Sequence, residues 1–207
     1  MVPIGVLASG RGSNLDAVLD AIDNRYLSKC EVKIVISNRP NAPALDLAKK
    51  HHVQSITLDD KGITKKSWDY DQKTIAALKS YGVGPEDGLI VLAGYLRILS
   101  EQFVDLYTRR IINVHPALLP SFPGLEAQKQ ALDHGVKVTG CTVHLVDREV
   151  DHGPIILQTA VAVRDDDTVD TLSTRILREE HRILPEAIRL LTEDQLKLEG
   201  RRVLFKT

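Results

Sequence analysis

The sequence predicts an α/β fold in which a mostly parallel sheet has helices on both faces. Short apolar segments typical of buried strands alternate with segments of helical periodicity, which is the pattern of repeated strand–helix units. Near residues 139–163 only a loop joins two apolar segments, so we expect an antiparallel C-terminal hairpin portion there. No internal repeat or linker is visible. We therefore expect a single Rossmann-like domain over residues 1–207.

The first half of the chain contains four expected strand–helix units. A Gly-rich turn follows the first strand, and Leu15, Val18 and Leu19 then recur at helical spacing. Gly94 ends the fourth strand, and Ser100 is a suitable N-cap for the helix after it. We expect strands at residues 4–8, 32–36, 55–58 and 89–93, and helices at residues 13–22, 43–51, 66–80 and 100–107.

The second half of the chain departs from this simple alternation. An apolar run predicts a fifth strand at residues 111–114, and a helix over residues 124–134 is ended by Gly135. Strands at residues 139–146 and 155–163 form the expected hairpin. A long helix over residues 168–191 follows, and a short tail completes the chain.

Composition excludes several classes of partner. The net charge of −1 gives no electrostatic reason to expect binding to nucleic acid or to an anionic membrane surface. No apolar run approaches the ~20 residues of a membrane span, and no basic leader precedes the first strand, so we expect no signal peptide. Cys30 and Cys141 are far apart and outside any C-x-x-C pair, which favours free thiols in the cytoplasm.

The end of the fifth strand has the composition of a reactive site. Strand side chains alternate, so Asn113 and His115 are expected on one face of the sheet. An amide beside a titratable imidazole suits the stabilisation of charge on a carbonyl oxygen. An aspartate from the polar loop at residues 147–154 could orient His115 or hold a proton. Singly, each residue favours a structural role, but their combination favours a site.

The loop at residues 9–14 is rich in glycine and opens the first helix. Free N–H groups and the positive dipole end at a helix start form a natural phosphate cradle. The Lys of a P-loop and the third Gly of a dinucleotide fingerprint are both missing, so a phosphate monoester is favoured over ATP or NAD. The motif fits equally well a tight turn in which Ser13 caps the helix.

Other polar groups favour ordinary roles. His51 and His52 lie at a helix end, where a cation complements the dipole. The acidic residues at 165–167 precede a helix and suit its N-terminus, and the remaining histidines are too scattered to form a metal-ligand pattern. We therefore expect no metal site. Glu180 lies inside the last helix, on a face that is solvated by default.

Four motifs occur together in the order and spacing of a known family. They are Gly10-x-Gly12-Ser13-Asn14, residues 93–99, Asn113-x-His115-Pro116-Ala117-Leu118-Leu119-Pro120 and Asp151-x-Gly153-Pro154. On these motifs the chain resembles the phosphoribosylglycinamide formyltransferases, folate-dependent formyltransferases of purine biosynthesis, over nearly its whole length. The resemblance implies formyl transfer from 10-formyltetrahydrofolate to the amine of glycinamide ribonucleotide by direct attack, with no metal and with a monomer or a homodimer.

The resemblance also implies roles for individual residues. Asn113, His115 and Asp151 would be catalytic, acting on the formyl oxygen, the developing oxyanion and the proton in transit. Gly12, Ser13 and Asn14 would bind the substrate phosphate, and Glu180 its ribose. Folate would contact Asn113 together with Lys65, Leu96, Arg97, Ile98, Leu99, Asp147, Arg148, Glu149, Val150 and Asp151.

A few positions depart from the family pattern. Lys65 stands where an Arg is frequent, Gln128 where a His is common, and Leu177 where a polar residue often approaches the phosphate. These departures affect substrate contacts and leave the three catalytic positions intact. Two other functions fit the motifs less well: a formyltetrahydrofolate hydrolase, and a non-catalytic phosphate- or nucleotide-binding module.

Overall fold

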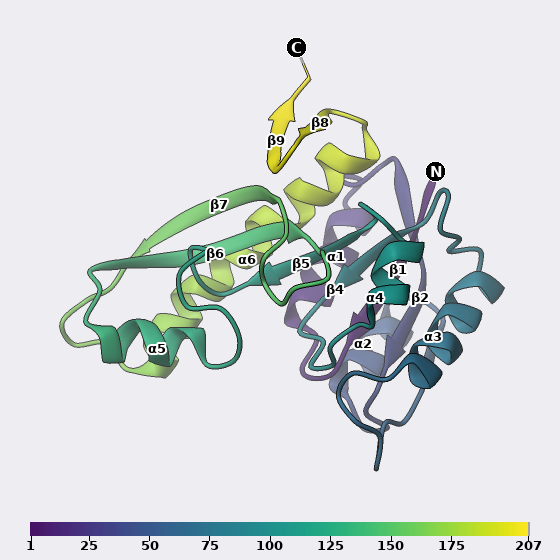
Figure 1. The fold of residues 1–207 in the computed structure, drawn as a ribbon, viewed down its shortest axis with the longest axis horizontal. Helices are drawn as coiled ribbons and strands as arrows, with labels where there is room; N and C mark the ends of the chain where they lie inside the picture. Colours follow the sequence, from purple (N-terminus) through teal and green to yellow (C-terminus); the bar gives the residue numbers. More distant parts are fainter. Residues whose placement is uncertain (207) are drawn as a thin grey trace. The chain divides into compact units, whose positions relative to one another are not determined.

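The computed structural model describes residues 1–206, and the chain divides into two compact units, Met1–Ile112 and Asn113–Thr207. Each unit is described by itself below, and Figure 1 labels the helices and strands of both. Within the described residues, no helix is long and apolar enough to cross a membrane.

The first unit is built on a parallel sheet. Its strands are β1 (Val2–Ala8), β2 (Cys30–Ser37), β3 (Ser55–Thr57) and β4 (Leu89–Leu92), hydrogen-bonded in the order β3-β2-β1-β4. Each of the three pairings is parallel. Strands β1 and β4 are continuous apolar runs because both of their faces are covered, and Ile4, Val6 and Leu7 of β1 are completely buried.

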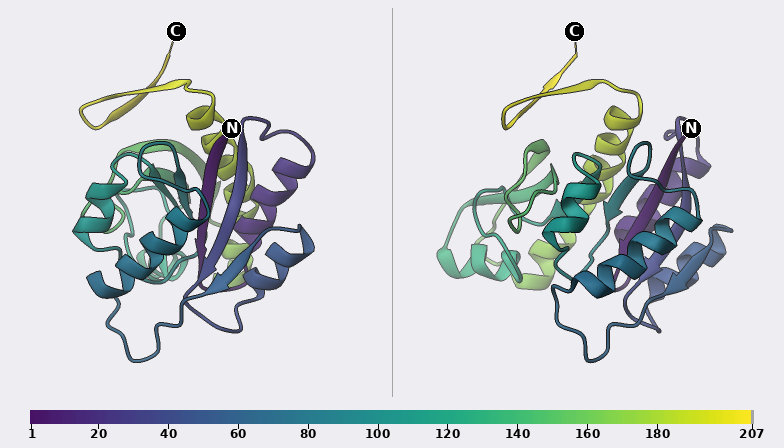
Figure 2. Two further views of the ribbon diagram at one scale, coloured as in Figure 1. Left: turned by 90° about the vertical axis from the view of Figure 1, so that its right-hand side faces the viewer. Right: turned by 45° about the vertical axis from the view of Figure 1, so that its right-hand side comes forward.

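Four helices cover this sheet. They are α1 (Ser13–Asp23), α2 (Pro43–Lys50), α3 (Trp68–Ser80) and α4 (Glu101–Leu106). Figure 2 shows α1 and α2 on one face of the strands, and α3 and α4 on the other. Local sequence sets their starts: Pro43 is the first residue of α2, and the side chains of Ser67 and Ser100 cap α3 and α4. The predicted layers and four strand–helix units of this half are confirmed.

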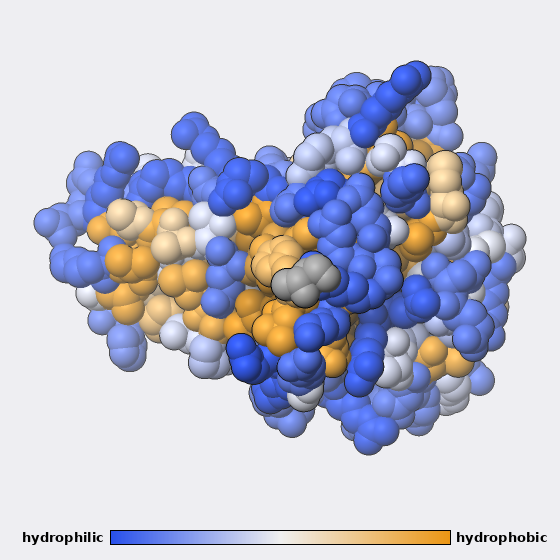
Figure 3. All heavy atoms as spheres, turned by 90° about the horizontal axis from the view of Figure 1, so that it is seen from above, coloured by the Kyte–Doolittle hydropathy of each residue, from blue (hydrophilic) through white to orange (hydrophobic). Residues whose placement is uncertain are grey.

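The second unit continues from β5 (Ile111–His115), whose last three residues belong to it. The strand order continues β5-β6-β7, with β6 (Val138–Leu145) and β7 (Ile155–Ala162) paired antiparallel. This pairing confirms the predicted hairpin. Figure 3 shows apolar side chains along the left-hand part of the face that it draws, over this hairpin. The strand β7 ends the order, and its side chains are only partly buried.

Two helices and a small hairpin complete the second unit. The helices are α5 (Ala127–His134) and the 24-residue α6 (Val169–Thr192), which packs on β6, β7 and α5. A reciprocal capping box between Thr168 and Thr171 starts α6. Its buried stripe, which includes Leu172, Ile176 and Ile183, repeats at helical spacing and faces the strands.

Two predictions about this half are wrong in detail. The fifth helix begins at Ala127 instead of residue 124, because Gly124 and Glu126 have φ angles of 83° and 57°, outside the right-handed helical region. The tail forms an antiparallel hairpin, β8 (Leu196–Glu199) with β9 (Arg202–Phe205), which turns at Gly200 with φ 60°.

Candidate active site

The end of β5 brings two polar side chains onto one carboxylate. Asn113 and His115 lie two residues apart on the strand, so both project to the same face. The Nδ1 atom of His115 is 3.3 Å from Oδ2 of Asp151, and Nδ2 of Asn113 donates to Oδ1 of Asp151 at 3.4 Å. The three residues that were singled out in the sequence therefore form one cluster within the second unit.

The ring of His115 is buried between two hydrogen-bond acceptors. Its Nε2 lies 2.8 Å from the carbonyl oxygen of Phe122, and because a carbonyl only accepts, Nε2 carries a hydrogen. Burial lowers the pKa of His115, and this effect outweighs the opposing effects of the Asp151 carboxylate and the Phe122 carbonyl. The ring is thus neutral near pH 7. Its Nδ1 faces the carboxylate of Asp151, which would stabilise a proton added to that nitrogen.

Asp151 is held as a charged carboxylate. Its Oδ2 accepts the N–H of Gly124 at 2.8 Å, and its backbone has a left-handed φ of 53°, which Asp tolerates better than most residues. Burial raises the pKa of Asp151, but His144, the Gly124 N–H and His115 together hold it below its ordinary value. A negative charge therefore sits beside the imidazole at neutral pH.

A second histidine, His144 on β6, belongs to this cluster and was not predicted from the sequence. Its Nδ1 is 2.9 Å from the Leu145 carbonyl, so Nδ1 carries the hydrogen and Nε2 is free to accept. Nδ2 of Asn113 lies 3.2 Å from this Nε2, which fixes the orientation of the amide. The sequence did contain a signal for this residue. Strand alternation puts His144 on the same face of β6 as Thr142, the residue that anchors the loop after β5.

Thr142 anchors the loop that follows β5. Its Oγ1 donates to the carbonyl of Ala117 and accepts the N–H of Leu119, both within the second unit. The Leu119–Pro120 peptide bond is cis, and Phe122 has a φ of 54°. This path returns the chain so that the carbonyl of Phe122 meets His115 and the N–H of Gly124 meets Asp151. Both backbone contacts were missed from the sequence.

The loop between β6 and β7 supplies Asp151 and four further predicted folate contacts, Asp147, Arg148, Glu149 and Val150. Asp147 accepts the N–H of Glu149 and lies 2.8 Å from Nδ1 of His152, so the turn is organised by its own side chains. Arg148, Glu149 and Val150 are exposed. Of the five predicted site residues of this loop, Asp151 points inward, Asp147 organises the turn, and the other three face solvent.

Glu180 does not lie on a solvated face, contrary to its default interpretation. It is 6% exposed within α6, and Leu177 is half-buried on the same helix. Burial and the nearby carboxylates of Glu180 and Glu179 raise the pKa of the Cys141 thiol to about 12. Glu180 is thus a buried carboxylate of the second unit that lies near the thiol of Cys141.

In the first unit, the glycine loop forms the start of α1. Gly12 is the N-cap with a φ of 82°, and a Cβ there would lie 2.8 Å from Cα of Ala44. No side chain caps the helix, so the alternative in which Ser13 is the cap is wrong. The first turn of the helix, at Ser13 and Asn14, is the positive end of its dipole.

Arg97 in the predicted folate loop is a buried anchor. Its side chain is 1% exposed, donates to Asp60 Oδ2 at 2.9 Å and to the Thr64 carbonyl at 2.9 Å, and lies over the ring of Tyr70. Burial opposes the charge of Asp60, but Asn38, Arg97 and a second arginine hold its pKa below its ordinary value. The contacts of Arg97 with Asp60 and Thr64 therefore fix the position of this loop within the first unit.

The rest of this loop presents apolar groups. Leu96 and Ile98 are 54% and 39% exposed, whereas Leu99 is buried. The N–H of Ile98 donates to the carbonyl of Lys65 at 3.1 Å, so Lys65 and residues 96–99 lie together. Lys65 itself is exposed. Leu96 and Ile98 thus form an exposed apolar surface of the first unit, which we call the apolar ledge, and the cation of Lys65 lies beside it.

A sequence model of the formyl transferase family matches residues 3–188. The chain belongs to the formyl transferase family. Among curated members of this family, it is 38% identical to the phosphoribosylglycinamide formyltransferase of Escherichia coli, over 94% of this chain and 89% of that protein. It is 36% identical to the phosphoribosylglycinamide formyltransferase of Bacillus subtilis, over 92% and 95%.

A solved member of the formyl transferase family has the same fold. Glycinamide ribonucleotide transformylase 1 of Symbiobacterium toebii is 48% identical with a TM-score of 0.93, covering all of this chain and 95% of its own. The α/β fold with a mostly parallel sheet is thereby confirmed. The chain also matches the human trifunctional purine biosynthetic protein adenosine-3 at 40% identity, but spans only 19% of its length.

Proposed function

We propose that the chain transfers the formyl group of 10-formyltetrahydrofolate to the primary amine of glycinamide ribonucleotide, a step of purine biosynthesis. The observation that carries this proposal is the cluster of Asn113, His115 and Asp151 in a member of the formyl transferase family. Full-length similarity to phosphoribosylglycinamide formyltransferases supports the choice of substrates.

In the proposed reaction the amine nitrogen attacks the formyl carbon directly. A C–N bond forms while the carbonyl oxygen takes up negative charge. The tetrahedral intermediate then collapses, and the bond between the formyl carbon and the folate nitrogen breaks. The proton that the amine loses balances the one that the folate nitrogen gains. No bond forms to the protein, so the side chains act by orienting groups and stabilising charge.

The three residues would divide this work. Asn113 would donate to the formyl oxygen as negative charge develops there, giving up its long 3.4 Å contact to Asp151. His115 would stabilise the oxyanion and protonate the departing nitrogen, and acceptors on both of its ring nitrogens favour a transient imidazolium. Asp151 would hold His115 in orientation and help to relay the amine proton.

Substrate contacts follow from the groups that each unit presents. The phosphate would bind at Gly12, Ser13 and Asn14, where helix N–H groups and the dipole favour an anion. Buried Glu180 would accept from ribose hydroxyls. Folate would use the exposed Leu96 and Ile98, the Lys65 cation, and the remaining predicted residues, which are Arg97, Leu99, Asp147, Arg148, Glu149, Val150 and Asp151.

The direct test is to follow folate absorbance with purified protein, with and without glycinamide ribonucleotide. We expect loss of the formyl group only when the amine is present, with formylated ribonucleotide as the product. Release of formate at the same rate without the amine would overturn the transferase proposal.

A hydrolase is the alternative that the comparisons favour next. A formyltetrahydrofolate deformylase from Pseudomonas syringae is 25% identical with a TM-score of 0.83, covering all of this chain and 66% of that one. In a hydrolase, water replaces the amine as the nucleophile and formate is released. The absorbance assay separates the two, because only the transferase depends on the added amine.

We also propose a cytoplasmic location and a monomer or homodimer. The two cysteines are buried free thiols, as expected of a protein in a reducing compartment. Cell fractionation tests the location, and sedimentation of the purified chain over a range of concentrations tests the state of association.

A further inference from the structure

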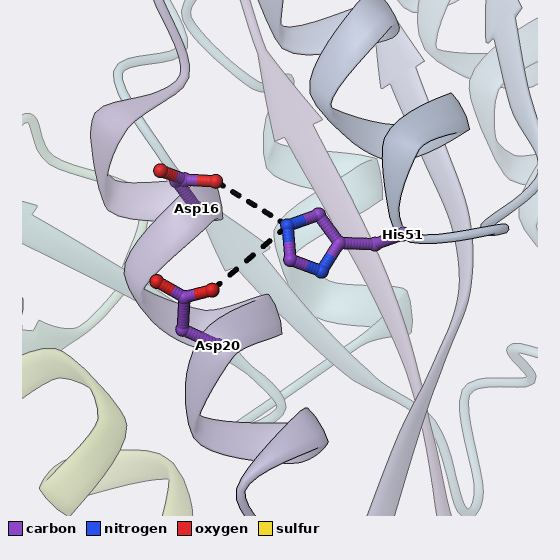
Figure 4. Close-up of side chains that lie close together, drawn as sticks. All are labelled: Asp16, Asp20 and His51. Atoms are coloured by element: carbon purple, nitrogen blue, oxygen red, sulfur yellow. Dashed lines mark ion pairs between the residues drawn. The ribbon is translucent and has the colours of Figure 1, made fainter.

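Three potential metal ligands converge in the first unit, on the side of α1 that faces the end of α2. Asp16 and Asp20 lie one turn apart on α1, and His51 is the C-cap residue of α2. Figure 4 shows the His51 imidazole pointing toward both carboxylates. Nε2 of His51 is 3.4 Å from Asp16 Oδ1 and 4.0 Å from Asp20 Oδ1. All three candidate ligand atoms lie within 4.8 Å of one another.

The histidine is buried and oriented as a ligand would be. Its side chain is 7% exposed, and Nδ1 contacts Asp23 Oδ2 at 2.7 Å. The carboxylate of Asp23 accepts, so Nδ1 carries a hydrogen, and in the neutral ring Nε2 then has the lone pair. Within the described chain, neither Nε2 nor Oδ1 of Asp16 makes a hydrogen bond, although both atoms are buried. In many metal sites, a carboxylate accepts a hydrogen bond from one nitrogen of a histidine while the other nitrogen binds the metal. Asp23 and His51 have this arrangement.

Charge balance also favours a cation at this place. Three carboxylates, those of Asp16, Asp20 and Asp23, surround one imidazole. Even a protonated His51 would leave a net charge of −2, because three charges of −1 meet one of +1. Like charges at positions i and i+4 of a helix destabilise it. A divalent cation would remove this repulsion.

The spacing suits a small divalent metal. Zinc bonds of about 2.0–2.1 Å in a tetrahedron place neighbouring ligand atoms roughly 3.3 Å apart. The 3.4 Å contact already has this spacing, and closing the 4.0 Å contact needs only a rotation of Asp20, which is 66% exposed. Asp16 is 38% exposed, so solvent can supply the remaining ligand.

We propose that Asp16, Asp20 and His51 bind one divalent transition-metal ion of the zinc class, with Asp23 as the positioning residue behind His51. The imidazole nitrogen favours such an ion over magnesium or calcium, which prefer oxygen ligands. The ion takes no part in formyl transfer. It joins α1, four residues after the Gly12 turn, to the end of α2, and it stabilises the first unit.

The test is calorimetric titration of chelator-treated protein with zinc chloride, with magnesium chloride as the control ion. We expect one zinc site that raises the melting temperature, and no response to magnesium. The variants His51→Gln and Asp20→Asn should each weaken zinc binding at least about 10-fold, as should Asp23→Asn. His52→Gln, an exposed neighbouring histidine, is the matched control and should bind as the parent does.

Cobalt substitution gives an independent readout. Bound Co²⁺ in a site of low coordination number absorbs visible light strongly, and we expect this absorption in the parent and in His52→Gln but not in His51→Gln. Asp20 is exposed, so Asp20→Asn keeps the test valid if His51→Gln fails to fold. Zinc affinity and cobalt absorption that are unchanged in Asp20→Asn, or in folded His51→Gln, would overturn the proposal.

Discussion

The chemistry proposed for this chain depends on a few polar atoms around His115. Both ring nitrogens face acceptors, the Phe122 carbonyl and the Asp151 carboxylate, yet the ring is almost completely buried. Burial favours the neutral ring, and the acceptors favour the cation. The proposed chemistry requires the ring to take up and release a proton during one reaction cycle, and the acceptors at both nitrogens would hold the added proton.

The lowered pKa of His115 predicts a pH dependence of stability. The unfolded chain, with an ordinary pKa of 6.5, binds this proton more readily than the folded one, so stability falls as the pH drops through that value. The fall ends once the pH is below the folded pKa. In His115→Asn this contribution is absent. We expect the melting temperature of the variant to drop less than that of the parent between about pH 7.5 and about pH 5.5. Equal drops would show that His115 titrates alike in both states.

Arg97 and Asp60 provide a second prediction. Their side chains are 1% and 9% exposed, so removing one partner leaves an uncompensated buried charge. Arg97→Met should lower the free energy of unfolding by about 3–5 kcal/mol, measured by urea denaturation. Lys49→Met, which breaks the exposed pair with Asp46, is the control and should cost about 0–1 kcal/mol. Equal small losses in both variants would contradict the anchoring role of Arg97.

Among the helices and strands, those with strong local signals were predictable. Strands β1 and β4 are apolar on both faces, and serine or proline marks the starts of several helices, so the existence and order of these elements follow from pattern alone. The hairpin of β6 and β7 was predictable because only a loop joins two long apolar runs.

The errors arose where backbone conformation overrides the pattern. Left-handed residues at Gly124 and Glu126 delay α5, and periodicity does not reveal them. The hairpin of β8 and β9 was missed because its strands have four residues each, although Gly200 marks its turn. Likewise, His144 contacts Asn113, and His51 meets Asp16, through contacts between residues distant in sequence.

The turn between β6 and β7 makes a prediction about Gly153. A Cβ at this position would lie 1.8 Å from the Leu145 carbonyl oxygen, the same atom that His144 Nδ1 contacts. Gly153→Ala must therefore displace backbone close to Asp151. We expect a loss of about 1–3 kcal/mol in urea denaturation, together with reduced turnover. Gly10→Ala adds a Cβ into open space and should leave stability unchanged. A fully stable and active Gly153→Ala protein would show that the turn is not constrained as described.

For the whole molecule, the proposed tasks are divided along the chain. The glycine turn and the apolar ledge belong to the first unit, and the groups proposed for formyl chemistry belong to the second. The β5 alternation and the family motifs predicted the cluster of Asn113, His115 and Asp151, which we propose to be catalytic. It could not show that Asp151 reaches His115, because that contact depends on a left-handed turn 36 residues further along the chain.

The most direct test of the catalytic cluster is a single-turnover measurement on Asp151→Asn. The folate and ribonucleotide are mixed with excess enzyme, and the affinity for glycinamide ribonucleotide is measured separately by calorimetry. We predict that formyl transfer slows by about 10²–10³-fold while the ribonucleotide binds as it does to the parent. An unchanged rate, or a loss that is fully explained by weaker ribonucleotide binding, would contradict the role of Asp151 in the chemical step.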